Sequence, residues 1–162
     1  MARFRVSPNL EEYNQKIYEL GANAKEYIEA AAKKGANPVA DAVRANINGI
    51  PVDDGYKRPG EMRHGLRSIQ KAGLQHSLGI APVRNDNGFI NVKVGFDGYN
   101  SLQSSRWGGG QPNMLVARSI EGGTSYMIAH PFVGPAVRSS RRQAEDVMKQ
   151  EIERSINSIM GG

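Results

Sequence analysis

Residues 121–160 decide the fold. They open with Glu121-Gly122-Gly123-Thr124, continue with Ala129-His130-Pro131-Phe132-Val133-Gly134-Pro135-Ala136, and then keep a helical pattern to Met160. Adjacent glycines can adopt backbone angles closed to other residues, so a sharp turn after a strand is predicted. Proline has a fixed φ and no N–H, which suits the lead-in and first turn of a helix. The apolar residues that follow lie on one helical stripe, which predicts a long helix over 131–160: Val133, Val137, Ala144, Val147, Met148, Ile152, Ile156 and Ile159.

The N-terminal part predicts helices over residues 10–48, preceded by a basic arm, residues 1–9, that is flexible or orders on a partner. Steps of three and four give a helical seam: Leu10, Tyr13, Ile17, Leu20, Ala24, Tyr27 and Ala31. Lys33-Lys34-Gly35 is typical of a helix end, and Asn37-Pro38 of a new helix start. The seam is expected to pack against the C-terminal helix or to contact another subunit.

The middle of the chain, residues 65–120, predicts a small sheet. Strands are expected over Leu74–Arg84, Phe89–Phe96 and Met114–Ile120, with a hairpin turn in Asn85-Asp86-Asn87-Gly88. A glycine-rich insertion, residues 97–113, separates the last two. The predicted fold is therefore α+β, a single domain over 1–162. In it, an antiparallel sheet of about three to four strands packs against N-terminal helices and a long C-terminal helix.

These motifs, in this order, carry a resemblance to a known family. A strand ending in Glu121-Gly122-Gly123-Thr124, a loop, the Pro131-Phe132 turn and a long terminal helix resemble the neck or tail-completion proteins of long-tailed bacteriophages, the lambdoid gene-product-ten type. Gly65-Leu66-Arg67-Ser68-Ile69 is similar to the family's Gly-x-Leu-x-x-Ser-Ile element. The resemblance covers about residues 10–159. The doubled glycine and the long insertion depart from the family pattern.

The resemblance implies a structural virion protein rather than an enzyme. Such a protein forms a homo-oligomeric, six-fold ring at the neck, between the head-completion or connector protein and the tail terminator or tail tube protein. DNA passes through the lumen without sequence-specific contact. The implied location is the virion neck, with the host cytoplasm as the site of assembly.

The amino-acid composition limits which catalytic, metal and phosphate-binding sites the chain can form. The chain of 162 residues contains no Cys and three His, so thiolate chemistry is excluded and a His-rich metal site is not expected. Gly108-Gly109-Gly110 lacks the Lys-Ser/Thr of a phosphate loop. Glu121 with His130 could act as an acid–base pair, but a structural hydrogen bond is the favoured interpretation of Glu121. We expect no catalytic residue, no cofactor and no metal. No apolar run is long enough to suggest a membrane helix.

Two groups of residues are candidates for contacts with partners. Trp107, beside Arg106 in the insertion, is either an interface anchor or folded back over its own sheet. Arg138, Arg141 and Arg142 are either a solvated face paired with Glu145 and Asp146 or a ring of positive charge in the assembly. The motif residues Glu121, Thr124 and Phe132 complete the set. The net charge of +5 and these arginines support an alternative function, a nucleic-acid-binding accessory protein.

Overall fold

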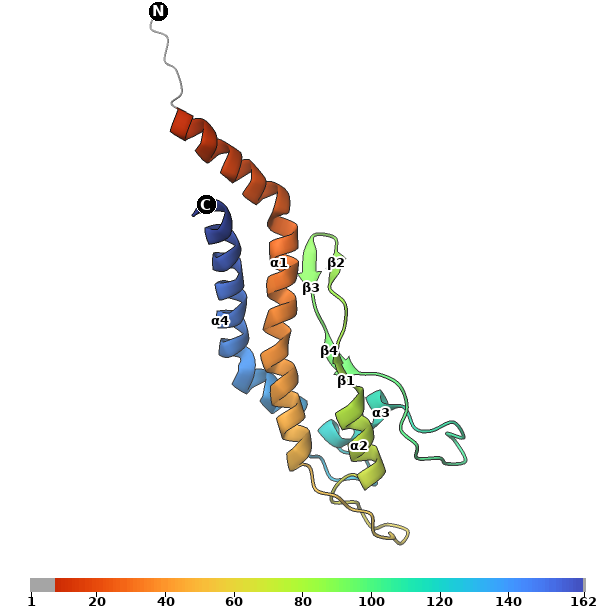
Figure 1. Ribbon diagram of the computed structural model, residues 1–162. Coiled ribbons are helices and arrows are strands. Elements are labelled where there is room, and N and C mark those ends of the chain that lie inside the picture. The colour runs from red at the N-terminus through yellow and green to blue at the C-terminus, as the bar shows by residue number, and fades with distance from the viewer. Residues whose placement is uncertain (1–7, 162) are drawn as a thin grey trace, which may run out of the picture.

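A computed structural model describes residues 8–161, and Figure 1 shows its elements. In chain order these are α1 (Pro8–Gly49), α2 (Ser68–Ser77), β1 (Leu78–Ile80), β2 (Arg84–Asp86), β3 (Phe89–Asn91), β4 (Val94–Phe96), α3 (Asn113–Gly122) and α4 (Val133–Met160). The α+β class and the long C-terminal helix are confirmed. Residues 1–7 of the predicted arm lie outside the described residues, and Pro8 and Asn9 already belong to α1.

α1 is one continuous helix, so the predicted break at Gly35–Pro38 is wrong. Pro38 lacks the N–H that would bond to the carbonyl of Lys34, four residues earlier. The side-chain amide of Asn37 supplies a donor to that same carbonyl oxygen, at 3.2 Å. This replacement lets the helix continue through the proline. α1 also changes direction within its N-terminal part (Figure 1).

α4 runs beside the C-terminal part of α1 (Figure 1). The two helices come close at Gly35, where an added Cβ would collide with Met148 Cγ and come within 3.2 Å of the Ala144 carbonyl oxygen. A side chain at this position would therefore have to displace Met148. Lys34 pairs with Glu151 across the same two helices, at 2.7 Å, and this hydrogen bond lowers the pKa of Glu151. These contacts at Lys34 and Gly35 lie beyond the predicted seam, in which Ala31 is buried while Tyr13 and Ile17 are about half exposed. Contact of the seam with another subunit stays a prediction.

The four strands form two small antiparallel sheets rather than one. β1 pairs with β4, and β2 pairs with β3. The predicted hairpin turn is confirmed: Asn87 and Gly88 connect β2 to β3, both with positive φ, 54° and 93°. Such angles match the twist of two-residue hairpins. The strand predicted from Leu74 begins only at Leu78, because Leu74 and Gln70 are buried on one face of α2.

The strand predicted over Met114–Ile120 is wrong, since this segment is helix α3. Its buried residues are Asn113, Val116, Ala117 and Ile120, which follow the spacing of one helical face rather than the alternation of a strand. Gly123 ends the helix with a φ of 72°, and an added Cβ would lie 3.1 Å from the nitrogen of Ala129. The turn predicted at the two glycines therefore depends on Gly123 and follows a helix.

The core lies where the C-terminal half of α1 meets α2, α3, the start of α4 and the sheet of β1 and β4. Its members are Val43, Ile47, Ile50, Leu66, Leu74, Leu78, Phe96, Val116, Ala117, Ile120, Phe132 and Ala136. The rings of Phe96 and Phe132 are tilted, with centroids 5.9 Å apart. The core therefore fixes the relative positions of α2 and α3, which support the site described below.

The N-terminal third of α1 extends past the end of α4 (Figure 1). At about 1.5 Å per residue, the 42 residues of α1 span about 63 Å and the 28 of α4 about 42 Å. No residue from 11 to 30 is buried, and three apolar residues there are close to half exposed: Tyr13, Ile17 and Ile28. We call the exposed apolar residues Tyr13, Ile17, Tyr18 and Ile28 the α1 seam. Of these four residues, Tyr13 and Ile17 also belong to the helical seam predicted from the sequence. Within residues 8–161, none of the helices has the length and apolar composition needed to cross a bilayer.

Candidate functional site

The glycine-rich insertion is closed at its base by two buried asparagines. Asn100 N–H donates to the carbonyl of Gln111 at 3.0 Å, and Asn113 N–H donates to that of Gly98 at 3.1 Å. The two side chains meet each other at 3.4 Å, and both lie against α2 at Gly73, where an added Cβ would come within 2.7 Å of each. The base of the insertion is thus fixed to the body of the protein.

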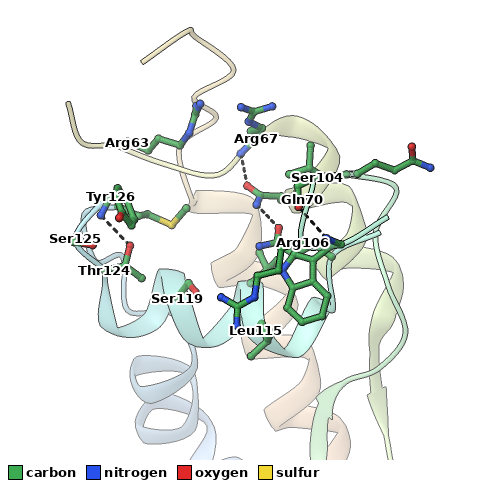
Figure 2. Close-up of a pocket in the computed structure, with 16 residues that line it drawn as sticks. Arg63, Arg67, Gln70, Ser104, Arg106, Leu115, Ser119, Thr124, Ser125 and Tyr126 are labelled. Carbon is green, nitrogen blue, oxygen red and sulfur yellow. Dashed lines mark hydrogen bonds between the residues drawn. The ribbon is translucent and has the colours of Figure 1, made fainter. Parts of the chain in front are cut away.

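A cavity of about 660 Å³ opens between this insertion, α2, α3 and the turn at residues 124–127 (Figure 2). We call it the arginine pocket. It is lined by Arg63, Arg67, Gln70, Leu102, Gln103, Ser104, Arg106, Trp107, Gln111, Leu115, Val116, Ser119, Thr124, Ser125, Tyr126 and Met127. The lining includes three arginines and no Asp or Glu. The pocket is therefore electropositive with partly apolar walls.

The three arginines differ in the hydrogen-bond acceptors and carboxylates that the protein supplies to their guanidinium groups. Arg63 donates to the carbonyl oxygens of Asp53, at 2.7 Å, and Gly55, and its guanidinium lies 3.9 Å from the Asp53 carboxylate. Within residues 8–161, neither Arg67 nor Arg106 has a carboxylate partner. Arg106 instead lies over the Trp107 ring, 5.5 Å from its centroid. Figure 2 shows its guanidinium extending over α3, toward Ser119.

The pocket unites three of the candidate residues, Arg106, Trp107 and Thr124. Trp107 is half-buried. Its backbone N–H donates to the Ser104 carbonyl at 3.0 Å and its carbonyl accepts from the Ser104 N–H at 3.2 Å, so the two residues form a tight turn. Thr124 closes a turn with Met127 through two backbone hydrogen bonds. The Trp107 side chain lies beside the Arg106 guanidinium and forms one wall of the cavity, and its role as an interface anchor stays a prediction.

Glu121 has a structural role at the start of α4. Its carboxylate accepts hydrogen bonds from the N–H groups of Phe132, Val133 and Gly134, at 2.7, 2.8 and 2.9 Å. Burial of the carboxyl raises its pKa, but these bonds and the charge of Arg138 outweigh burial and hold the pKa below its usual value. Among the described residues, this carboxylate accepts hydrogen bonds from backbone N–H groups and not from His130, so the two do not form an acid–base pair.

Phe132 is a core residue, with 1 % of its surface exposed. Its ring packs on Phe96, and its carbonyl accepts a hydrogen bond from Asn46 of α1 at 2.9 Å. It is therefore not available for the interface contact expected from the sequence.

The basic cluster Arg138, Arg141 and Arg142 lies on the exposed face of the first turns of α4. Arg141 pairs with Glu145 at 2.9 Å, one of the two pairings expected for a solvated face. Arg138 lies in the field of Glu121. Part of the positive charge of this cluster is thus neutralised within the chain.

The sequence did not single out Arg63, Arg67 and Gln70 as site residues. Gln70 is buried, accepts from Arg67 N–H at 3.0 Å and donates to the Gln111 side chain at 2.7 Å, so it joins α2 to the insertion. One feature of the sequence could have indicated a basic site here. Arg63 and Arg67 are four residues apart at the entry to α2, without an acidic residue between them.

Comparison of the chain with models of protein families, with curated proteins and with solved structures gave no match.

Proposed function

We propose that this chain is a structural assembly subunit, a neck or tail-completion protein that forms a ring between the head connector and the tail of a long-tailed bacteriophage. The observation that carries the proposal is the α1 seam, a set of apolar side chains on one helix that residues 8–161 leave between 45 % and 80 % exposed. The order of motifs along the sequence supports the identity of the assembly, through the resemblance described above.

The α1 seam has the composition of a contact surface. Tyr13 and Ile17 are 51 % and 48 % exposed, and Tyr18 is 80 % exposed. Burial of one such side chain contributes about 1.5–3 kcal/mol. Large apolar side chains grouped on a surface usually mark a site of contact with another molecule. A partner helix or a second subunit would therefore bind here with a favourable free energy.

A ring follows when the seam of one subunit contacts a different surface of the next. Such an interface is heterologous, and it closes if the rotation between neighbours divides a full turn. The resemblance supports six subunits, with the head-completion or connector protein on one face and the tail terminator or tail tube protein on the other. DNA would pass through the lumen, and the assembled ring would reside in the virion after assembly in the host cytoplasm.

The test uses two variants of the same stretch of helix in a phage that lacks this protein. Ile17→Lys places a charge in the seam, whereas Gln15→Lys places the same charge at an exposed polar position of the same helix. We expect Gln15→Lys to restore heads joined to tails and Ile17→Lys to leave them separate, as counted by negative-stain imaging. Joined, infectious particles in the complete absence of the protein would contradict the proposal.

The nucleic-acid alternative makes a different prediction for the same purified protein. It requires tight duplex binding by the monomer that weakens steeply with salt and depends on Arg138, Arg141 and Arg142. The proposal expects weak or no binding by the monomer until a ring forms.

A further inference from the structure

We propose that the arginine pocket binds an acidic peptide segment of a partner protein, with carboxylates on Arg67 and Arg106 and apolar side chains against the walls. The charge of the pocket is the starting point. Among the described residues, its lining holds three arginines and no Asp or Glu, and of the three only Arg63 donates to backbone carbonyls and lies near a carboxylate. The pocket therefore presents two cations that lack a carboxylate among the described residues.

Arg67 and Arg106 are suited to carboxylate recognition. A guanidinium can donate two parallel hydrogen bonds to one carboxylate, which gives both strength and orientation. The cation–π contact of Arg106 with Trp107, 5.5 Å from the guanidinium carbon to the ring centroid, leaves the N–H groups of Arg106 free to donate. Arg67 stands at the entry to α2, where its backbone N–H is fixed by the buried Gln70.

The remaining walls fit a peptide better than a nucleic acid. Leu102 and Met127 are half-buried, and Leu115 is 40 % exposed, so apolar side chains of a ligand could be covered here. The lining has no lysine, and the arginines at the start of α4 do not contribute to it. Binding of a nucleic-acid strand needs a basic path that follows the backbone beyond a single pocket.

The volume of the cavity limits how many residues of a peptide it can hold. About 660 Å³ lies within the range of roughly 300–1,000 Å³ typical of pockets that enclose one small ligand. This volume accommodates a few side chains of an extended segment and is too small for a duplex. The clamped base of the insertion, at Asn100 and Asn113, keeps the pocket formed before the ligand arrives, which reduces the entropy lost on binding.

This inference goes beyond the proposed ring and does not depend on it, since the α1 seam and the arginine pocket share no residue. A protein that fails to form a ring could still bind the peptide. A protein that forms a ring without binding the peptide would refute only the pocket.

The experiment titrates the full chain with a blocked peptide of alternating Asp and Leu residues, and with the matched peptide of Asn and Leu. Trp107 is the only tryptophan of the chain, so its fluorescence reports on the pocket directly. Calorimetry provides the affinity for variants that alter the fluorescence. We expect saturable binding of the Asp peptide that weakens with salt, and binding of the Asn peptide that is weaker by about tenfold or more.

Arg67→Gln and Arg106→Gln should each weaken binding of the Asp peptide by about tenfold, because each removes a charged hydrogen-bond donor. Arg84→Gln removes an exposed arginine of β2 outside the pocket and should leave the affinity unchanged. Circular dichroism of each variant establishes that it is folded. Equal affinity for the two peptides, absence of saturable binding, or tighter binding of a thymidine oligonucleotide than of the Asp peptide would each overturn the assignment.

Discussion

The backbone nitrogen of Phe132 lies 2.7 Å from a carboxylate oxygen of Glu121, so the last turn of α3 caps the first turn of α4. The first N–H groups of a helix have no partner within it, and the N-terminus carries a partial positive charge. A carboxylate that accepts hydrogen bonds from three of these N–H groups gives them partners, and its negative charge interacts favourably with the partial positive charge. Glu121 therefore joins the short helix beneath the arginine pocket to the long C-terminal helix.

Glu121→Gln should lower the free energy of unfolding by about 1–3 kcal/mol at neutral pH, because charged hydrogen bonds to three N–H groups are lost. The pKa of Glu121 is lowered in the folded protein, from an ordinary value of 4.5. A group with a lowered folded pKa stabilises the protein above its unfolded pKa, and the effect is lost as the pH falls through the folded pKa. The difference between wild type and variant should therefore be complete above pH 4.5 and shrink at lower pH.

Denaturant unfolding at a series of pH values measures this difference. Glu145→Gln is the control, because it removes an exposed carboxylate of a surface pair, worth at most about 1 kcal/mol. A difference between Glu121→Gln and wild type that stays constant from neutral to acidic pH would show that the carboxylate charge does not stabilise α4.

Gly35→Val should destabilise the protein by about 1–3 kcal/mol, because the added atoms meet Met148 and the carbonyl of Ala144, where α4 packs against α1. Gly21→Val is the matched control: nothing lies within 4 Å of an added Cβ, and valine is a somewhat better helix former than glycine. Thermal unfolding should show a lower Tm for the first variant and an unchanged or slightly higher Tm for the second. A lower Tm for Gly21→Val than for Gly35→Val would mean that the two helices do not pack at Gly35.

Local signals explain which helices could be predicted. α4 has a long apolar stripe without an interior breaker after Pro135, and it was predicted almost to the residue. α1 contains Gly35 and Pro38, which ordinarily end a helix, and it continues through them with one tertiary and one local feature. Glycine is needed for contact with Met148, and Asn37 satisfies the carbonyl of Lys34. Neither feature can be recognised without the position of α4 or of the side-chain amide.

α3 shows a different cause of error. The strand predicted over Met114–Ile120 rested on the following Glu121-Gly122-Gly123-Thr124 motif, which ends a strand in the family that the sequence resembles, and its alternation is incomplete at Leu115 and Val116. The buried set begins with a polar residue, Asn113, whose burial depends on Asn100 and the carbonyl of Asp97. Only with Asn113 counted as a buried position does the helical spacing become complete. The arginine pocket could not be predicted for the same reason, since it depends on how the insertion folds over α2 and α3.

Gly110→Ala should open the base of the insertion. Gly110 has a φ of 102°, and an added Cβ would collide with the carbonyl oxygen of Asn100. Such strain costs about 1–3 kcal/mol. Gly109→Ala is the control, because Gly109 has open space and no positive φ.

Hydrogen exchange followed by mass spectrometry provides the readout. The N–H groups of Asn100 and Asn113, which bond across the base of the insertion, should lose protection in Gly110→Ala and keep it in Gly109→Ala. Unchanged protection in both variants would contradict the clamped base.

Trp107→Ala should leave the protein folded and reduce the joining of heads to tails. Trp107 is half-buried at the wall of a pocket, so its loss is expected to affect stability much less than Phe132→Ala, a core truncation that costs about 3–5 kcal/mol. Aromatic side chains at contacts often contribute about 2 kcal/mol or more. Thermal unfolding and particle counts are measured on the same variants. A folded Trp107→Ala protein that joins particles as well as wild type would exclude Trp107 as an anchor.

The most direct test of the central claim is the mass of the assembly formed by the purified full chain, determined by native mass spectrometry over a range of concentrations. The account predicts a closed oligomer, with six subunits as the resemblance implies, for the wild type and for Gln15→Lys. It predicts monomers for Ile17→Lys, whose charge lies in the uncovered seam of α1. A wild-type chain that stays monomeric at every concentration, alone and with the connector and tail proteins present, would contradict the claim. Equal oligomer formation by Ile17→Lys would show that the seam is not the interface.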